Sequence, residues 1–170
     1  MIIDLVTLRS SPYAFNASFT PEEIDLESEN AELKSPAKIE AKLAKRIMQA
    51  DIEGEITAAV NIECSRCLQM IEKTLNFPFS VSYASPENYT EAREAELSES
   101  DLEVALFDGQ HIDIKELVRE QILLNLPTQV FCSEDCKGLC QKCGANRNMN
   151  DCGCEEKEID PRWSALKNLK

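Results

Sequence analysis

The strongest hydrophobic pattern in the chain predicts an amphipathic helix over residues 113–126. Asp113 is an N-cap candidate, Glu116 follows three residues later, and Pro127 ends the segment. One polar residue interrupts an otherwise apolar stripe with the spacing of a helix face: Ile114, Leu117, Val118, Gln121 and Ile122. We expect this helix to pack its apolar side onto a sheet.

Alternating apolar and polar residues predict two β-strands, over residues 55–64 and 75–83. Both segments are rich in β-branched and aromatic side chains. The sequence Cys64-Ser-Arg-Cys67 lies between them, in the place of a hairpin connection, and residues 1–8 alternate loosely enough to form another strand. An antiparallel β-sheet covered by one core helix is an α+β domain.

Two patterns compete in residues 35–49. Ser35 followed by Pro36 has the form of a helix start. The same residues also fit the period of a strand, with apolar and charged side chains on opposite faces: Ile39, Ala41, Leu43 and Ile47 against Lys38, Glu40, Lys42 and Arg46. Local rules do not decide between helix and strand here. By the same capping logic, Thr20-Pro-Glu-Glu predicts a short turn of helix.

Acidic residues are concentrated in the first part of the chain. Residues 1–130 contain 24 Asp and Glu against 11 Lys and Arg, whereas residues 131–170 contain 7 of each, so the net charge of −13 belongs to the first part. Eight acids and one Arg fall in residues 85–108, which we interpret as a solvated acidic loop. We expect an acidic α+β domain over residues 1–130 and a small cysteine-rich zinc-binding tail over residues 131–170.

This charge also bears on the partner. An acidic body repels the phosphate backbone of bare RNA and attracts a basic protein. The start of the chain does not read as a signal peptide, because Asp4 interrupts its apolar residues, and no run approaches the roughly 18 apolar residues that span a bilayer. We expect a cytoplasmic protein with reduced thiols and no membrane partner; the oligomeric state is left open.

Six of the eight cysteines lie within residues 132–154, where their spacing predicts a metal site. Cys140 and Cys143 have the two-residue spacing of a tight metal-binding turn, and the glycine that follows can adopt the positive φ of such a turn. Cys152 and Cys154 project to one side of an extended backbone. We predict that these four thiolates hold a structural Zn²⁺ in a closed tetrahedral site.

Other ligand sets remain open. Cys132 and Cys136 are alternate ligands that, in a helix, would share a face with Cys140 and replace Cys152 or Cys154. Four thiolates also suit iron–sulfur ligation, and redox disulfide cycling is a further alternative. No His or Glu near the cysteines is placed to activate a metal-bound water, so we predict no catalytic residue and no enzyme.

Cys64 and Cys67 form a separate Cys-x-x-Cys unit. A thioredoxin-type redox pair opens a helix after a strand, whereas this pair joins two predicted antiparallel strands. Arg66 between the thiols would favour a thiolate, which makes the hairpin a candidate functional element. Alternatively, the pair completes a second metal site with Cys132 and Cys136, which would use all eight cysteines.

Several motifs occur together in the order typical of one family. They are Cys64-Ser-Arg-Cys67-Leu68, the helix end Leu124-Asn-Leu-Pro127, Cys136-Lys-Gly-Leu-Cys140, Cys143-Gly-Ala-Asn146, Cys152-Gly-Cys154 and Asp160-Pro-Arg-Trp-Ser-Ala-Leu166. From about residue 50 to the C-terminus the chain resembles the YceD family of large ribosomal RNA subunit accumulation proteins. The resemblance implies a strand at residues 37–49 and a factor needed for normal levels of large-subunit rRNA. It also implies a gene commonly beside that of ribosomal protein L32, and no established catalytic residue.

Three hypotheses about function follow. The first is a non-enzymatic ribosome biogenesis factor that supports accumulation of 23S rRNA, with an acidic domain that binds a basic ribosomal protein, L32 being a candidate, and/or pre-rRNA. The second is a zinc protein that binds RNA directly through its tail, where Lys137, Lys142 and Arg147 surround the metal turn. The third is a thiol-redox enzyme that uses Cys64 and Cys67.

Overall fold

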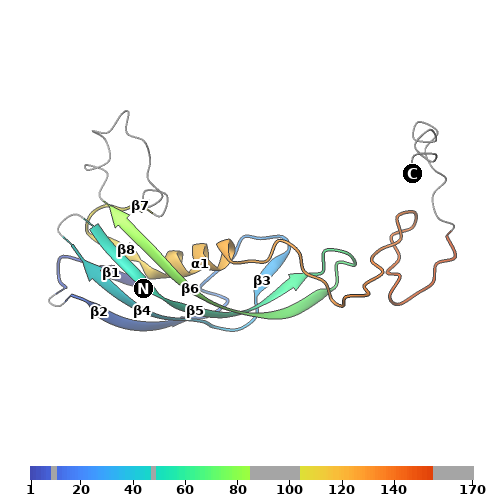
Figure 1. Ribbon diagram of the computed structural model, residues 1–170, viewed down its shortest axis with the longest axis horizontal. Helices are drawn as coiled ribbons and strands as arrows, with labels where there is room; N and C mark the ends of the chain where they lie inside the picture. The colour runs from blue at the N-terminus through green and yellow to red at the C-terminus, as the bar shows by residue number, and fades with distance from the viewer. Residues whose placement is uncertain (9–10, 47–48, 85–103, 155–170) are drawn as a thin grey trace, which may run out of the picture.

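A six-stranded sheet forms the body of the protein in the computed structural model, which describes residues 1–8, 11–46, 49–84 and 104–154. The strand order is β2-β4-β5-β6-β7, and β3 also pairs with β5, beyond the end of β4 (Figure 1). All pairs are antiparallel except β6 with β7. The strands are β2 (Tyr13–Phe19), β3 (Ala31–Leu33), β4 (Ala37–Lys45), β5 (Gln49–Glu63), β6 (Met70–Ala84) and β7 (Val104–Leu106).

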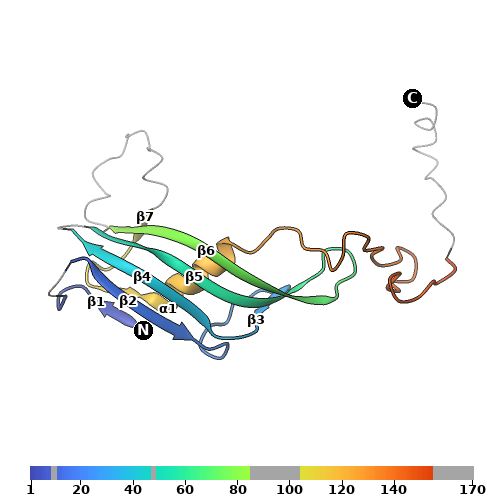
Figure 2. The same ribbon diagram turned by 60° about the horizontal axis from the view of Figure 1, so that its bottom comes forward.

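The remaining elements lie beside this sheet. β1 (Ile2–Asp4) and β8 (His111–Asp113) form a separate antiparallel pair, and α1 (Ile114–Leu124) follows β8 directly. Figures 1 and 2 show that α1 runs along one face of the large sheet. The described part of the chain is therefore mostly antiparallel sheet with one helix, which confirms the predicted α+β arrangement of sheet and packed helix.

β5 and β6 form a long hairpin of two 15-residue strands. The register pairs Glu63 with Met70, so the connecting loop is residues 64–69 and contains the Cys-x-x-Cys unit, as predicted. The strands extend beyond the predicted segments because pairing continues to Gln49 and Ala84 at the other end. The Cys-x-x-Cys loop therefore stands at one end of the sheet (Figure 1).

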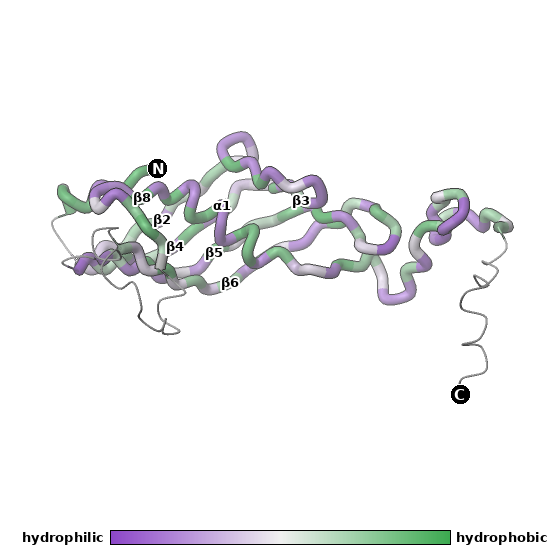
Figure 3. The backbone as a smooth tube through the Cα atoms, turned by 90° about the horizontal axis from the view of Figure 1, so that it is seen from above, coloured by the Kyte–Doolittle hydropathy of each residue, from purple (hydrophilic) through white to green (hydrophobic). Residues whose placement is uncertain are grey.

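β4 resolves the ambiguous segment in favour of the strand. Its side chains alternate between buried and exposed, with Ala37, Ile39 and Leu43 fully buried and the intervening Lys and Glu residues exposed. Figure 3 shows the same alternation of hydropathy along the strands. The locally plausible helix start at Ser35 fails because β4 pairs with β2 over residues 37–43 on one side and with β5 over residues 38–45 on the other.

The helix prediction is confirmed in its position, cap and face. The Asp113 carboxylate accepts a hydrogen bond from the Lys115 backbone N–H at 2.9 Å, and the helix ends before Pro127. Glu116 does not close a capping box and pairs instead with Arg119 at 2.8 Å. The apolar stripe packs against the sheet, and its buried members are Ile114, Leu117, Val118 and Ile122.

At Gly54 the backbones of β4 and β5 leave no room for a side chain. A Cβ atom at this position would lie 2.2 Å from the Glu40 carbonyl oxygen and 2.7 Å from the Ala41 Cα atom. Backbone atoms cannot move aside as a flexible side chain can, so only glycine fits between these strands. The glycine thus permits the tight pairing that brings β4 onto the central hairpin.

Three further sequence predictions are met only in part or lie outside the described residues. At Thr20 a single turn forms, with the Ile24 N–H donating to the Thr20 carbonyl at 3.1 Å, but no helix continues from it. Residues 85–103 of the predicted acidic loop lie outside the described residues, and the segment ends earlier than predicted because 104–106 form β7. The Asp160-Pro-Arg-Trp motif also lies outside the described residues.

Candidate metal centres

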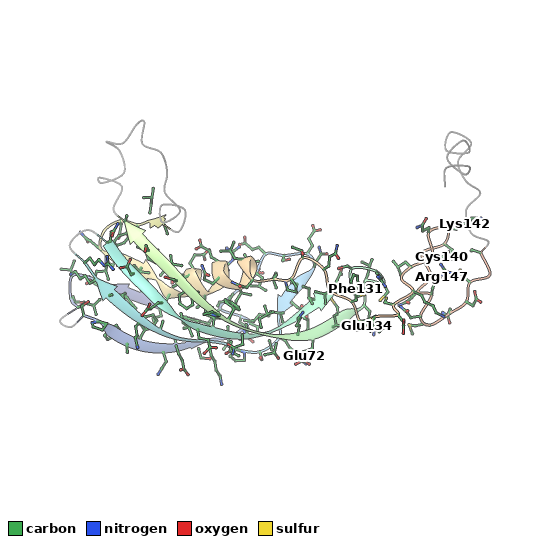
Figure 4. The ribbon with its side chains drawn as sticks, viewed as in Figure 1. Glu72, Phe131, Glu134, Cys140, Lys142 and Arg147 are labelled. Atoms are coloured by element: carbon green, nitrogen blue, oxygen red, sulfur yellow. The ribbon has the colours of Figure 1, made fainter. Side chains whose placement is uncertain are left out.

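The eight cysteines gather into two groups of four. Within each group the four sulfur atoms lie within 4.8 Å of one another. The inner group, at the β5–β6 loop, consists of Cys64, Cys67, Cys132 and Cys136; the outer group, farther along the tail, consists of Cys140, Cys143, Cys152 and Cys154. Figure 4 shows Cys140 at the end of the molecule beyond the sheet. Each group can hold a metal ion.

These groups correspond to two predictions made from spacing. The structure brings together the four cysteines predicted as the zinc ligands, which are the outer group. Cys132 and Cys136 do not lie in a helix and join Cys64 and Cys67, the arrangement in which all eight cysteines are used. They are therefore not placed to replace Cys152 or Cys154.

Backbone hydrogen bonds hold the tail against the β5–β6 loop. The Ser65 N–H donates to the Val130 carbonyl at 2.7 Å, and the Val130 N–H donates back to the Ser65 hydroxyl at 3.1 Å. Farther along, the Leu139 N–H donates to the Arg66 carbonyl at 3.0 Å. These bonds place Cys132 and Cys136, which lie between the two attachment points, beside the cysteines of the loop.

The Arg66 side chain points at the tail. Its Nη1 donates to the carbonyl oxygens of Glu134 at 3.3 Å and Cys136 at 3.1 Å, and its guanidinium lies over the Phe131 ring. Sequence reasoning gave this arginine the role of favouring a thiolate. In the structure its side-chain charge is directed to tail carbonyls and an aromatic face, which makes it a clamp on the tail.

The two Cys-x-x-Cys loops share one backbone conformation. In each loop, the carbonyl of the first cysteine accepts a hydrogen bond from the N–H of the residue that follows the second cysteine. The N–H of the first cysteine donates to the carbonyl of the next residue along the chain, two positions after the second cysteine. The bonds are Leu68 to Cys64 (3.0 Å) and Cys64 to Gln69 (2.9 Å) in one loop, and Gly144 to Cys140 (2.9 Å) and Cys140 to Ala145 (2.8 Å) in the other. Such a turn directs two sulfurs at a single ion.

The residue after the second cysteine has a positive φ in both loops. Gly144 has φ 73°, as predicted from its position. Leu68 has φ 58° although it is not glycine, and its side chain is 56% exposed. A left-handed conformation costs a leucine roughly 1–2 kcal/mol. The fold therefore imposes the same turn where the local sequence disfavours it.

Backbone N–H groups stabilise the thiolate of the first cysteine in each Cys-x-x-Cys turn. Burial raises the pKa of the Cys64 thiol, but hydrogen bonds from the N–H groups of Arg66, Cys67 and Cys132 outweigh it and lower the pKa to about 6. The backbone N–H groups of Cys143 and Lys142 lower the pKa of Cys140 to about 6 as well. Cys64 and Cys140 are each the first cysteine of a Cys-x-x-Cys turn. The conformation shared by the two turns directs backbone N–H groups at the sulfur in this position.

Neighbouring sulfurs have the opposite effect on another thiol of each group. Hydrogen bonds with the sulfurs of Cys136 and Cys67 raise the pKa of Cys132 to about 12. The sulfurs of Cys143 and Cys152 raise the pKa of Cys154 to about 12. Several thiolates so close together repel one another, and a divalent cation between them removes this repulsion because a coordinated thiol is deprotonated.

Asn148 contacts a sulfur of the inner group, a role that the sequence did not indicate. Its side-chain Nδ2 lies 3.4 Å from the Cys136 sulfur, and its Oδ1 accepts from the Lys137 backbone N–H at 2.8 Å. It thereby connects the segment between the two groups to an inner-group sulfur. No spacing rule identifies such a residue, because the contact depends on the chain folding back from residue 148 to residue 137.

The three predicted RNA-contacting residues lie in the tail segment that carries the cysteine groups. Lys137 and Arg147 line the same shallow hollow, and Lys142 is exposed on the loop between Cys140 and Cys143 (Figure 4). His111 lies in β8, where it pairs with Asp108 at 2.9 Å. Among the described residues no helix has the length and apolar character needed to cross a membrane.

Comparison with known proteins places the chain in a family. Residues 52–170, which include both cysteine groups and most of the β5–β6 hairpin, match the family described as large ribosomal RNA subunit accumulation protein YceD. The chain belongs to the YceD family. This confirms the resemblance found in the sequence motifs.

Individual relatives cover different shares of the chain. An uncharacterized protein of Mycobacterium tuberculosis (strain H37Rv) is 30% identical over 115 residues, which are 68% of this chain and 53% of the relative. YlbN of Bacillus subtilis is 26% identical over 159 residues, 92% of this chain and 88% of its own. The chloroplastic YCED homolog 1 of Arabidopsis thaliana, named a large ribosomal RNA subunit accumulation protein, is 24% identical over 157 residues, 80% and 49% of the two chains.

The chain spans about half the length of the mycobacterial relatives and of the Arabidopsis homologue that it matches. No solved structure matches it.

Proposed function

We propose that this chain is a non-enzymatic ribosome biogenesis factor that acts in the cytoplasm and supports accumulation of 23S ribosomal RNA. The observation that carries the proposal is membership of the YceD family, whose Arabidopsis and maize relatives are named for large ribosomal RNA subunit accumulation. The protein acts by binding, because its clustered thiols form closed groups of four, an arrangement that suits structural metal and leaves no coordination position for a substrate.

The proposed partner of the acidic domain is a basic ribosomal protein, with L32 as the candidate. Residues 22–32 contain six acids and no Lys or Arg. Ile24 and Leu26 anchor this segment in the core, and the carboxylates between and around them are exposed. Arg119 holds the segment further by pairing with Glu27 at 2.8 Å. Carboxylates fixed in this way attract a basic protein without the ordering cost of a mobile tail.

A charge-matched comparison tests this assignment. Replacing Glu22 and Glu29 with Gln removes two charges from the acidic segment and leaves the Glu27–Arg119 pair intact. Replacing Glu53 and Glu55 with Gln removes the same charge from exposed positions on β5. We expect the first variant to bind purified L32 severalfold more weakly than the second at moderate salt. Equal loss in both variants, or tighter binding of the wild type to naked rRNA than to L32, would contradict the proposal.

The outer group is proposed to hold Zn²⁺ in a structural role. Four thiolates within reach of one ion are the ligand set of closed zinc sites. In residues 137–154, Ala145 and Cys140 share one backbone bond and Arg147 and Gly138 another, so the segment folds over short distances around the cysteines. The metal would supply most of the stability of a segment that has little apolar core of its own.

Direct RNA binding through the tail is a second candidate function. It is favoured by Lys137 and Arg147, which line one hollow of the tail, and by Lys142, which is exposed between Cys140 and Cys143. Replacing all three with Gln should lower affinity for a 23S rRNA fragment and reduce its salt dependence. The matched control replaces three exposed lysines of the sheet, Lys38, Lys42 and Lys73. Unchanged RNA affinity in the tail variant would reject this candidate.

A thiol-redox function of Cys64 and Cys67 receives less support from the geometry. The pair lies in a loop between antiparallel strands and faces two further cysteines, whereas redox pairs of the thioredoxin type open a helix. We therefore assign the pair to metal binding, as argued next.

A further inference from the structure

The four cysteines of the inner group lie in a buried cluster between the β5–β6 loop and the tail. Cys64, Cys67 and Cys136 are 0%, 4% and 4% exposed, and Cys132 and Leu139 pack against them. This cluster is separate from the main core between α1 and the sheet. The interior that the tail shares with the β5–β6 loop therefore consists mainly of cysteine side chains.

The separations between these sulfurs match the ligands of one ion. The Cys64 and Cys136 sulfurs lie 3.8 Å apart, and those of Cys67 and Cys132 lie 3.6 Å apart. Sulfurs bound at about 2.3 Å to a tetrahedral Zn²⁺ stand about 3.8 Å from one another. A disulfide requires about 2.05 Å. The thiolates of a multi-iron cluster bind different iron atoms and stand farther apart than the ligands of a single ion.

Hydrogen-bond donors surround this group of sulfurs. The Cys132 N–H approaches the Cys64 sulfur at 3.4 Å, and the Asn148 amide approaches the Cys136 sulfur at the same distance. Such donors orient metal-bound thiolates and spread their negative charge. Arg66 donates to the Cys136 carbonyl and so holds the backbone of this ligand beside the group. The surroundings therefore suit thiolates, whereas a purely apolar interior would suit neutral thiols.

We propose that Cys64, Cys67, Cys132 and Cys136 bind a second Zn²⁺, so that the loaded chain holds one ion in each cysteine group. On binding, four Zn–S bonds form and each ligand that is still a thiol passes its S–H proton to solvent, with no change of oxidation state. Because two ligands come from the loop and two from the tail, this ion fastens the tail to the sheet. The inference is independent of the ribosomal function.

The inner ion has a structural consequence that distinguishes it from the outer one. The main core contains none of the eight cysteines, so the sheet and α1 can remain folded without this ion. The tail, in contrast, loses the interior that it shares with the loop. Removal of the inner ion should therefore release the tail from the loop, whereas removal of the outer ion should leave the attachment at Val130 and Leu139 in place.

Native mass spectrometry of the full chain loaded with Zn²⁺ tests the proposal. We expect two Zn²⁺ in the wild type and one in each of two matched variants: Cys64→Ser with Cys136→Ser, and Cys143→Ser with Cys154→Ser. A wild-type chain with one ion that the first variant retains overturns the proposal. A wild-type mass that reports disulfides within the inner group, or iron in place of zinc, also overturns it.

Two further measurements keep the test independent of misfolding. Amide hydrogen exchange of the first variant should show faster exchange at Leu139 and preserved protection in β4 and β5; unchanged exchange at Leu139 would contradict the fastening role. Titration of the unmutated apo chain with Co²⁺ should raise the thiolate-to-cobalt absorbance linearly up to two equivalents. A plateau at one equivalent would show that a second thiolate site does not exist.

Discussion

The guanidinium group of Arg66 lies over the aromatic ring of Phe131, with its Cζ atom 4.3 Å from the ring centroid. The same group donates to two tail carbonyls, so a single side chain from the β5–β6 loop contacts the tail at three points. The planar guanidinium can do this because its face and its edge interact with different partners. This contact, beside the inner cysteine group, fixes where the tail leaves the sheet.

We expect Arg66→Lys to weaken the attachment of the tail. A compact ammonium cannot cover the Phe131 ring and donate to both carbonyls in one position, and an exposed cation–π contact contributes about 0.5–1 kcal/mol. Hydrogen exchange at the Leu139 N–H, which donates to the Arg66 carbonyl, reports the change as severalfold faster exchange. Lys73→Arg, at an exposed position of β6, is the reciprocal control. Exchange at Leu139 that does not change would show that the guanidinium is not the clamp.

The positive φ of Leu68 predicts an unusual response to substitution. Leu68→Gly should stabilise the protein by about 0.5 kcal/mol, because relief of the left-handed strain exceeds the entropy that glycine adds to the unfolded chain. Gly144→Ala should destabilise it by about 1 kcal/mol; no atom lies within 4 Å of the added Cβ, so only the backbone conformation opposes the change. Urea denaturation at fixed Zn²⁺ measures both. Destabilisation by Leu68→Gly would mean that the leucine side chain makes a contact worth more than the strain.

Gly54→Ala should disrupt the sheet. The added methyl would overlap the Glu40 carbonyl, and the strands must separate to admit it, with an expected cost of about 3 kcal/mol or more. Thermal unfolding followed by circular dichroism should show a large fall in Tm. Glu53→Ala, one residue away and exposed, is the control and should change Tm little. A Gly54→Ala protein as stable as the control would contradict the close approach of β4 and β5.

The pair of His111 and Asp108 predicts an observable pH dependence. The hydrogen bond with Asp108 raises the pKa of His111 above 6.5, and hydrogen bonds from His111 and Gln110 lower the pKa of Asp108 to about 2. The contribution of His111 to stability is complete below pH 6.5 and is lost as the pH rises through its raised pKa. That of Asp108 is present above pH 3.8 and is lost as the pH falls towards 2.

An NMR titration of the chain's single histidine checks this pair. The His111 ring protons should titrate above pH 6.5 in the wild type and return towards 6.5 in Asp108→Asn. Asp4→Asn removes the other charge that raises this pKa and should shift it less. A larger shift in Asp4→Asn than in Asp108→Asn would reverse the assignment of the cause.

Sequence alone identified the elements whose signals are local. α1 is specified by a capping Asp113, an apolar stripe and Pro127, all within one segment, and the structure has the helix there. The β5–β6 hairpin is specified by two alternating segments around a short connection. The turn at Cys140 and Cys143 is specified by their spacing and by Gly144, since a glycine accepts the positive φ that the turn requires.

Tertiary structure alone decided the features that depend on distant segments. Residues 37–45 are a strand because β2 and β5 pair with them; their own side-chain pattern left helix and strand open, and only the family resemblance favoured the strand. Cys132 and Cys136 join Cys64 and Cys67 because the tail returns to the β5–β6 loop, whereas spacing along the chain equally allowed them to join Cys140. A ligand set is defined by sulfur positions in space, and spacing fixes those positions only within a single turn.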